Sequence, residues 1–467
     1  GKIFQRGGSP FSERNRGKEI VSHQGPGNGL PLGPLAGAPA FLALAANCLL
    51  LFLDARGVPL PASLGAALLA AMFIVLAGSL DGIPPRSVAV FLLVILFTLA
   101  GAVILVPRVH RGDLEPFHLS SAGTVLYERP WGRGRVILIG TPRGKYVVHL
   151  PPSSLFLEGD RVQVDGVVQP LEKAAKEGDF DEARFWKAKG ADGKIRRPDI
   201  RLDGEGRAGV LGLRRSLREK ILMNLPPLMR GHLLAALLGG RDPDLAERHS
   251  AWGTSHLLAV SGLHTGMVVL VIFLLIPAGP FRIPAASLIM WLYVLCAGAS
   301  ASALRAGLMI QAGFIGRWLG RPSSTLNAVS AAGLFLLFWR PWFFWDLGWR
   351  LSMTAALILS CLFSGRGKGS RVTAPVLLWL ATAGMVTGVF GSVLVAGMII
   401  NFLAVPVFTV LLPLSFFLAV PSLAGIPGGW ILAEAGEGLY YAWGQFADLT
   451  ASLVPWEAPY SGLLSLS

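Results

Sequence analysis

The hydrophobic positions of this chain fall into long, uninterrupted runs. Three runs occupy about 35–53, 63–80 and 88–106, and roughly seven or eight more follow between 256 and about 455. Several exceed about 18 residues with almost no charge, which is the length at which a helix crosses the roughly 30 Å hydrocarbon core of a bilayer. The mean hydropathy of +0.57 points the same way. The pattern therefore predicts a polytopic α-helical membrane protein.

Two sections of the chain lack such runs. Residues 1–30 are rich in Gly, Ser and Arg without periodicity, which is typical of a disordered tail. Residues 108–206 contain short runs of Val and Ile separated by Gly and Pro, and GDRVQVDGVV at 159–168 alternates apolar and polar positions as a half-buried strand does. Four or five strands with one helix near 171–188 predict a small closed β-barrel of the OB type, with a β-sandwich as the alternative.

These changes in pattern divide the 467 residues into five parts. They are a disordered basic tail at 1–30, three transmembrane helices at 31–107, an OB-like β domain at 108–206, basic amphipathic linker helices at 207–255 and a polytopic domain at 256–460. In the linker, LRRSLREKI predicts a helix that lies at the membrane surface. The basic tail indicates a cytoplasmic N-terminus, so three crossings would place the β domain outside the cell.

The formal net charge is +13, and much of the excess lies in the polar insertion. A basic surface there fits an anionic partner, either lipid headgroups or nucleic acid. Aromatic residues among cations predict a face that binds single strands by base stacking and phosphate neutralisation. The candidates are Tyr127, Arg129, Trp131, Arg133, Arg135, Arg143, Lys145 and Tyr146. The alternative places the aromatics in the barrel core, since strands put only half of these side chains on any one face.

The run that begins with HLLAVSGLHTGMV at 256–268 carries polar groups in an apolar setting. His256 and His264 would lie about 12 Å apart on one straight helix, and no third ligand or HExxH motif is near, so we expect no metal site and no cofactor. Ser261 and His264 lie close to one helix face, but no third group orients them, which argues against an intramembrane serine protease. The open alternatives are hydrogen bonds between helices and the lining of a polar path.

Two stretches, 286–319 and 389–420, are too long for one crossing and contain small or polar residues where a break would fall. Discontinuous helices of this kind line cavities enclosed by protein, because lipid cannot satisfy freed backbone groups. In the first stretch, Arg305 would cost at least about 2.5–3.5 kcal/mol at a helix centre unless it meets water, an acid or an anion. Snorkelling from a helix end is the alternative.

Two further pairs of residues carry polar chemistry in this half. Asp346 and Arg350 stand one helical turn apart, so they either pair with each other or line a path. Asn401 and Pro406 predict a break in the second stretch, because Pro406 lacks an N–H group and frees the carbonyl of Phe402.

The order of these motifs resembles that of the ComEC family, the membrane channel proteins of bacterial natural competence. HLLAVSGLHTGMV looks like the family's signature, ASASALRAGLM like its serine-and-arginine helix, and GSVLVAGMIINFLAVPVF like its late Asn…Pro helix. RPSSTLNAVSAAGLFLLFWRPWFFWDLGWRLSM resembles the segments between them. Upstream, GDRVQVDGVV and FDEARFWKAKG resemble the family's OB-like domain. The similarity covers about 35–455.

The resemblance implies that one DNA strand crosses the plasma membrane during natural transformation, with the OB-like domain outside. It also implies partners, namely single-stranded DNA, the lipid bilayer, a DNA receptor and a cytoplasmic ATP-driven motor. Carried over by position, the candidate path residues are His256, Ser261, Gly262, His264, Gly266, Arg305, Asn327, Asp346, Asn401 and Pro406. Arg350 departs from the family, which more often has an uncharged polar residue there.

Many members of the family also carry a C-terminal metallo-β-lactamase-like domain with an HxHxDH metal motif. None of the eight histidines forms that motif, so we expect no enzyme activity here and a nuclease that is separate or missing. A secondary transporter for a small solute or ion is the rival prediction, because it shares broken helices and polar groups at mid-membrane depth. It gives no reason for a basic OB-like domain. An assembly scaffold for other uptake proteins is the third prediction.

Overall fold

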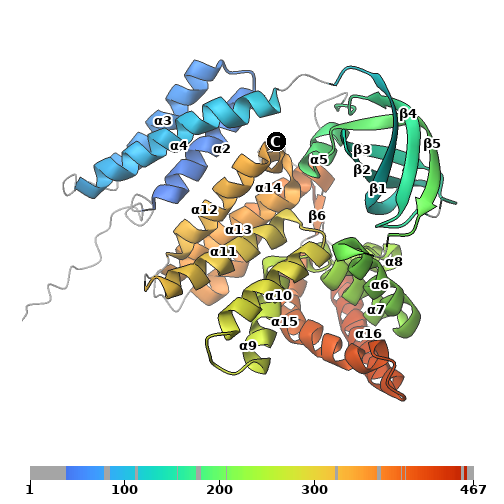
Figure 1. Cartoon of the computed structure of the whole chain (residues 1–467). Coiled ribbons are helices and arrows are strands. Elements are labelled where there is room, and N and C mark those ends of the chain that lie inside the picture. Colours follow the sequence, from blue (N-terminus) through green and yellow to red (C-terminus); the bar gives the residue numbers. More distant parts are fainter. Residues whose placement is uncertain are drawn as a thin grey trace, which may run out of the picture.

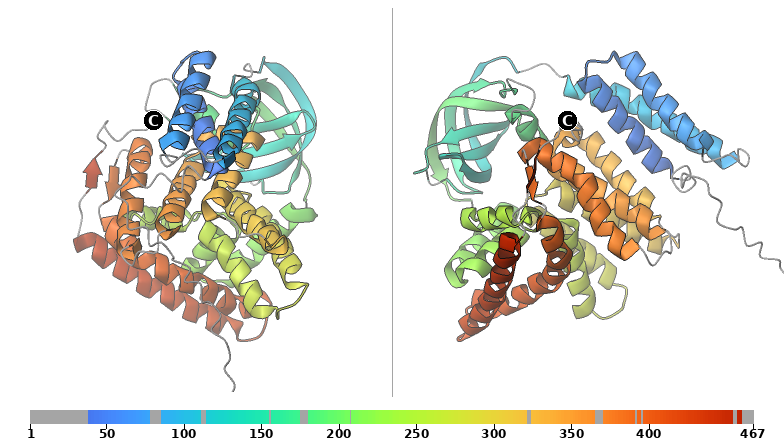
Figure 2. Two further views of the ribbon diagram at one scale, coloured as in Figure 1. Left: turned by 90° about the vertical axis from the view of Figure 1, so that its left-hand side faces the viewer. Right: turned by 180° about the vertical axis from the view of Figure 1, so that it is seen from behind.

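The computed structural model describes residues 38–77, 85–110, 114–154, 156–174, 180–206, 208–320, 324–364, 370–390, 392–394, 396–453 and 457–459. The tail predicted at 1–30 lies outside these ranges. Most of the described chain is helical, and one small β-barrel follows the first three helices. Figures 1 and 2 show the barrel at one end of the helical body, with the three N-terminal helices beside that body.

The three N-terminal helices coincide with the first three apolar runs. They are α2 (Pro39–Ala55), α3 (Leu60–Ala77) and α4 (Pro85–Val109). Fully buried side chains such as Leu50 and Leu105 form their shared core. α2 also packs on α12 (Thr325–Trp339), where the side-chain oxygen of Asn327 accepts a hydrogen bond from the Ala40 N–H at 3.3 Å. This contact attaches the N-terminal helices to the rest of the helical body.

The polar insertion folds into a five-stranded barrel. Its strands are β1 (Phe117–Trp131), β2 (Gly134–Thr141), β3 (Gly144–Leu150), β4 (Arg161–Gln169) and β5 (Gly193–Gly204). They close in the order β1-β2-β3-β5-β4, with β4 paired to β1, so the closed barrel is confirmed and the sandwich is wrong. Burial alternates along β4, where Val162, Val164 and Val168 face the core. The finer assignment to the OB type stays a prediction.

Helix α5 (Glu182–Ala188) connects the barrel to the helical body. The ring of Trp186 is fully buried and lies 5.5 Å from that of Trp131 on β1, measured between centroids. On its other side, α5 contacts the 3₁₀ helix η2 (Pro341–Trp345), and the Lys187 ammonium lies 4.6 Å from the Trp342 ring. The barrel is therefore held against the helices by aromatic and cation–π contacts at this point.

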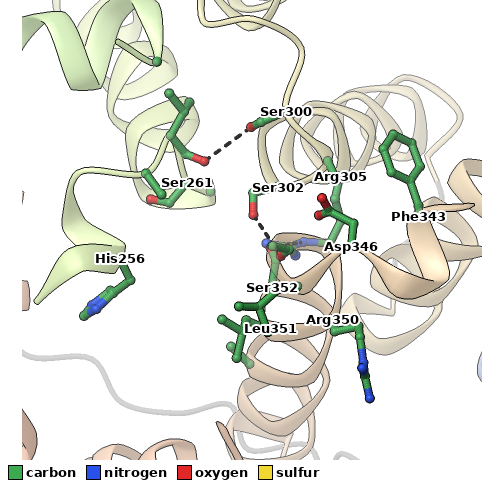
Figure 3. A pocket seen from close by; sticks show the side chains of 18 of the residues that line it. His256, Ser261, Ser300, Ser302, Arg305, Phe343, Asp346, Arg350, Leu351 and Ser352 are labelled. Carbon is green, nitrogen blue, oxygen red and sulfur yellow. Dashed lines mark hydrogen bonds between the residues drawn. The ribbon is translucent and has the colours of Figure 1, made fainter. Parts of the chain in front are cut away.

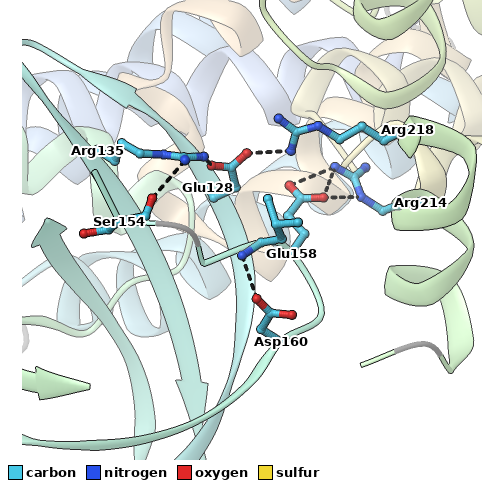
Figure 4. Close-up of polar contacts among 8 residues, drawn as sticks. Glu128, Arg135, Ser154, Glu158, Asp160, Arg214 and Arg218 are labelled. Carbon is cyan, nitrogen blue, oxygen red and sulfur yellow. Dashed lines mark hydrogen bonds and ion pairs between the residues drawn. The ribbon is translucent and has the colours of Figure 1, made fainter. Parts of the chain in front are cut away.

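Three short helices follow the barrel, namely α6 (Gly209–Asn224), α7 (Pro227–Leu238) and α8 (Pro243–Ala251). The basic face of α6 was predicted to lie on a membrane surface, and for its arginines this is wrong. Arg214, Arg215 and Arg218 pair instead with carboxylates of the barrel region, and Figure 4 shows the pairs of Arg214 and Arg218. Those carboxylates lie 55 to 90 positions away in the sequence, so they cannot be found by reading the helix alone.

The remaining elements form the helical body. They are η1 (Ser255–Leu257), α9 (Gly262–Leu275), α10 (Arg282–Cys296), α11 (Ala301–Trp318), α13 (Leu347–Ser364), α14 (Ser370–Phe390), β6 (Ser392–Leu394), α15 (Ala396–Leu423), α16 (Gly429–Leu453) and β7 (Glu457–Pro459). Within the described ranges, two helices are long and apolar enough to cross a membrane, Ala89–Val109 and Ile399–Leu423. Other apolar helices are shorter, with 10–17 residues.

Both overlong stretches are interrupted. The first breaks between Cys296 and Ala301, as GASASAL predicts, and the second at β6, which pairs with β7. The break predicted at Asn401 and Pro406 is wrong, because α15 continues through both residues. A proline removes only one hydrogen bond of the helix ladder, and the long contact of α15 with α16 supports the helix around it.

Candidate functional site

The stretch 256–268 is not one straight helix. The single turn η1 comes first, and α9 begins only at Gly262. The Ser261 N–H donates to Nδ1 of His264 at 3.1 Å, and the Ser261 hydroxyl lies 3.1 Å from the same nitrogen. Ser261 is therefore the N-cap of α9, and His264, three residues later, closes a capping box with it. The Nε2 of His264 is buried without a hydrogen-bond partner among the described residues.

The bend before α9 faces a cavity of about 3250 Å³ between the barrel and the helices. Figure 3 shows part of its wall, where side chains from separate helices face one another. Eight of the ten predicted path residues line this cavity, although they are spread over 150 positions of sequence. They are His256, Ser261, Gly262, Gly266, Arg305, Asp346, Asn401 and Pro406.

The other two predicted path residues, His264 and Asn327, do not line the described cavity, and their place on a path stays a prediction. His264 is only 5% exposed and closes the capping box of α9. Asn327 lies in the first turn of α12 and bonds to the backbone of α2. Both polar side chains hold elements of the fold together, which the sequence motif cannot distinguish from lining a path.

Arg305 is the most unusual charge at the cavity. It lies on α11 with 8% of its surface exposed, so it does not snorkel to the outside of the molecule. Its Nε donates to the Ser352 hydroxyl at 2.9 Å, and Nη1 lies 3.1 Å from the sulfur of Met309. A Cβ placed on Gly262 would stand 3.2 Å from Nη2. Within the described ranges, no carboxylate forms an ion pair with this guanidinium.

Asp346 lies near Arg305 but serves another purpose. Its carboxylate accepts a hydrogen bond from the Trp349 N–H at 2.7 Å, so it caps the start of α13. Figure 3 shows the Arg350 side chain pointing away from it. The pair expected from their spacing is therefore replaced by a cap, which is the usual use of aspartate at a helix start.

Asn401 joins α15 to the signature stretch. Its Nδ2 donates to the Gly253 carbonyl at 3.2 Å, and its Oδ1 is buried without a partner among the described residues. The two backbones approach closely there, because a Cβ on Gly397 would stand 3.2 Å from the Gly253 Cα. Asn401 thus fixes the turn that precedes η1.

Three of the eight barrel residues predicted to bind nucleic acid reach the cavity, namely Tyr127, Arg129 and Lys145. The Arg129 guanidinium lies 4.9 Å from the Trp131 ring and 5.6 Å from the Phe185 ring. Lys189 lies 5.2 Å from the Tyr127 ring. Cations and aromatic faces are therefore already paired at this wall.

The other five barrel candidates are placed elsewhere, so the single face predicted from the sequence is wrong. Tyr146 is fully buried in the core, where burial raises the pKa of its hydroxyl. Arg135 pairs with Glu128, and Trp131 packs on α5. Arg133 and Arg143 lie in exposed hairpin turns. Alternation along the strands divides these residues between the core and the surface.

Several cavity cations were not predicted. They are Arg56, Lys173, Arg184, Lys189, Arg214, Arg241 and Arg340. In total the described wall has eleven Lys and Arg residues and two acids, Asp181 and Asp346. Burial, and to a smaller extent the positive charge of Arg129, lower the pKa of the Arg241 guanidinium. Two of these cations, Arg184 and Lys189, lie in the motif FDEARFWKAKG, which could have extended the prediction of cavity residues to them.

No group of three or more His, Cys, Asp and Glu side chains that could hold a metal ion occurs in the described part of the chain. The described wall of the cavity carries instead hydroxyl groups, guanidinium groups and backbone polar atoms. Such donors suit an anion, because each N–H or O–H can replace a water molecule of its hydration shell.

The comparisons with known proteins agree with these motifs. Residues 237–466 match the family model described as competence protein. The chain is 28% identical over 249 residues to "ComE operon protein 3" of Bacillus subtilis (strain 168), which is 50% of this chain and 31% of that protein. No solved structure matches. Residues 237–466 therefore carry the competence domain of this family, and the chain as a whole resembles the ComEC family.

Proposed function

We propose that this chain acts in DNA uptake during competence and that its cavity is the path by which one DNA strand crosses the plasma membrane. The matching family supports the first part, because its model describes a competence protein. The composition of the cavity wall supports the second part. The chain would then be a multi-pass protein of the plasma membrane, to which the two helices of spanning length contribute.

The observation that carries the proposal is the state of Arg305. A buried cation without a carboxylate partner is costly, and the cost falls when an anion arrives. A phosphodiester offers one negative charge and two acceptor oxygens, which match the fork of a guanidinium. Each phosphate of the strand would complete the site in turn.

The remaining wall suits a chain of phosphates better than a single one. Its cations extend from the barrel side to the helices, as Arg129, Arg241 and Arg305 illustrate. At the barrel side, the rings of Tyr127 and Phe185 could stack on bases once their cations turn to phosphates. A polyanion would therefore meet aromatic and basic groups first and the buried guanidinium later.

Hydroxyl groups around Arg305 would weaken its hold on any one phosphate. Ser352 already bonds to the guanidinium, and the Ser302 hydroxyl donates to the Gly348 carbonyl at 3.4 Å. Ser261 stands on the opposite wall (Figure 3). A strand conducted by many weak sites can advance, whereas one tight site would stall it.

In this proposal the barrel faces the outside of the cell and the N-terminus lies in the cytoplasm, as the basic tail indicates. A receptor would present the DNA and an ATP-driven motor would pull the strand inward. Hydrolysis of the other strand is assigned to a nuclease outside the described chain.

A transporter for a small solute is less well supported. Sites for small molecules enclose about 300–1,000 Å³, whereas this cavity measures about 3250 Å³ and carries a large excess of cations. A scaffold without a path would not need a buried guanidinium.

The test replaces the resident channel protein of a transformable bacterium with this chain, either intact or with Arg305→Gln. Arg317→Gln is the control, because Arg317 lies on the same helix but is exposed and outside the cavity. Labelled DNA is followed to the surface and into the cytosol. We expect Arg305→Gln to lower import at least about tenfold with surface binding unchanged, since a charge-assisted contact is lost. Undiminished import by the variant would contradict the path and favour the scaffold.

A further inference from the structure

Three arginines of α6 contact carboxylates of the barrel region at the seam, and Figure 4 shows the contacts of Arg214 and Arg218. Arg215 pairs with Asp160 at 2.5 Å and Arg218 with Glu128 at 2.5 Å. Arg214 holds the Glu158 carboxylate with two nitrogens: Nε donates to Oε2 at 2.8 Å, and Nη2 lies 2.7 Å from Oε2 and 3.0 Å from Oε1. All three contacts dock the barrel on the helix.

Arg214 differs from the other two because it also reaches the helical body. Its Nη1 donates to the carbonyl of Cys296, the last residue of α10. The side chain is 8% exposed, and that of Glu158 is 12% exposed. Burial raises the pKa of Glu158 while Arg214 opposes that rise, so the pair is held in a poorly hydrated place. One guanidinium thus joins three elements.

The carbonyl that Arg214 holds begins the turn between α10 and α11. Gly298 has φ +84° and Ala299 has φ +49°, a left-handed conformation that costs an alanine about 1 kcal/mol or more. Ser300 then caps α11 by accepting the Ala303 N–H at 3.3 Å, and its hydroxyl donates to the Val260 carbonyl at 3.4 Å. Arg305 follows in the second turn of α11.

We propose that Arg214 is a positioning residue that couples the barrel to the α10–α11 turn and thereby sets the place of Arg305 in the cavity. The guanidinium is suited to this because its planar fork can hold a carboxylate with two nitrogens and a carbonyl with the third. A lysine has a single ammonium group and keeps the charge pair without bridging both acceptors. The part that concerns transport rests on the proposed function, whereas the coupling does not.

The test compares Arg214→Lys with Arg218→Lys in the purified full chain. Both variants keep a positive charge opposite a barrel carboxylate, but only the first removes the bond to Cys296. Hydrogen exchange is measured at the backbone N–H groups of 299–305 and, as a check on folding, at those of β2 and β4. We expect Arg214→Lys to speed exchange in 299–305 at least about tenfold, as the loss of one charge-assisted hydrogen bond implies. Barrel exchange should stay unchanged, and Arg218→Lys should leave the turn unaltered.

Unchanged exchange in 299–305 with Arg214→Lys would overturn the coupling, and so would an equal effect of Arg218→Lys. DNA import in cells is the second measurement, and we expect Arg214→Lys to reduce it about tenfold while surface-bound DNA is kept. Import equal to that of the intact chain despite a loosened turn would overturn the positioning role. If the turn loosens but the intact chain itself imports no DNA, the coupling stands and the proposed function fails.

Discussion

The barrel and the helical body each bury a charge to the same extent but treat it in opposite ways. Glu128 on β1 and Arg305 on α11 are both 8% exposed. Glu128 is held by Arg135 and Arg218, whereas no described carboxylate pairs with Arg305. Burial alone therefore does not reveal why a charge is present. The partner does, because a paired charge stabilises the fold, whereas a buried charge without a carboxylate partner is the feature on which the proposed path depends.

The same contrast extends to packing. Fully buried side chains such as Tyr146 and Ile137 fill the barrel, while a cavity of about 3250 Å³ lies between the barrel and the helices. A packed core with satisfied polar groups favours one rigid state. A wall of cations around open space stores electrostatic free energy that a polyanion can release. Removing a buried charge should therefore lower the free energy of unfolding in the barrel and raise it in the helical body.

The largest effect is expected where a charge is paired. Glu128→Gln should lower the free energy of unfolding by about 2–3 kcal/mol, below the full cost of breaking a buried pair because both arginines keep some contact with water. Thermal unfolding of the full chain in detergent, with amide exchange in the barrel, measures the loss. Asp199→Asn is the control, since its pair with Arg201 is exposed and should contribute less than about 0.5 kcal/mol. Equal effects of both substitutions would remove the contrast.

At Arg305, with which no described carboxylate pairs, removal of the charge is expected to raise the free energy of unfolding. Arg305→Met keeps an unbranched side chain without its charge, so it should raise the free energy of unfolding by about 1–2 kcal/mol while DNA import is lost. The same thermal unfolding measures the gain, and the exposed Arg317→Met should change neither quantity. A loss of stability with Arg305→Met would show that the guanidinium holds the fold and not a ligand.

A smaller change in the free energy of unfolding is expected at Asn401, whose one neutral hydrogen bond joins α15 to the turn before η1. Asn401→Ala removes the contact with Gly253 but also removes the unpartnered Oδ1, so the loss should be only about 0.5–1 kcal/mol. Faster amide exchange confined to 253–257 checks this expectation. Thr409→Ala is the matched control on the same helix, because among the described residues its hydroxyl bonds only to the Val405 carbonyl of α15 itself.

The smallest effect concerns pH and belongs to the barrel. His149 lies 2.9 Å from Glu182 on α5, and its hydrogen bond lowers the pKa of Glu182, with burial opposing and Lys194 adding to the effect. A lowered pKa contributes stability above the ordinary value of about 4.3 and loses it as the pH falls through the folded value. Unfolding at pH 7, 5 and 3 should show the loss only in the last step. Glu182→Gln should make that step smaller, and a step of unchanged size would refute the role of this carboxylate.

Much of the fold could be predicted because its signals are local. Long apolar runs place the helices, period-two alternation places strand β4, and GASASAL places the break after Cys296. The break at Pro406 was wrong because tolerance of a proline depends on neighbouring helices, which local sequence does not contain. The same limit applies to α6, where the acidic partners of the arginines lie in distant segments.

The candidate site could be predicted in part for a related reason. Motif residues line the cavity where their side chain has no obvious structural role in the fold, as with Arg305 in an apolar run. His264 and Asn327 do not, because a polar side chain can satisfy a backbone group just as well as a substrate. Cavity cations such as Arg241 and Arg340 stand alone in their local sequence and were missed.

Helix α15 carries a mechanical property that follows from its three internal prolines. Pro406, Pro413 and Pro421 lie within about 80° of one another around the axis at 100° per residue, and each removes one rung of the hydrogen-bond ladder. The helix should therefore bend more easily in the plane that contains the three prolines than in the plane perpendicular to it. Because Pro406 also forms part of the cavity wall, that wall can bend more easily in this one direction while the helix keeps its length.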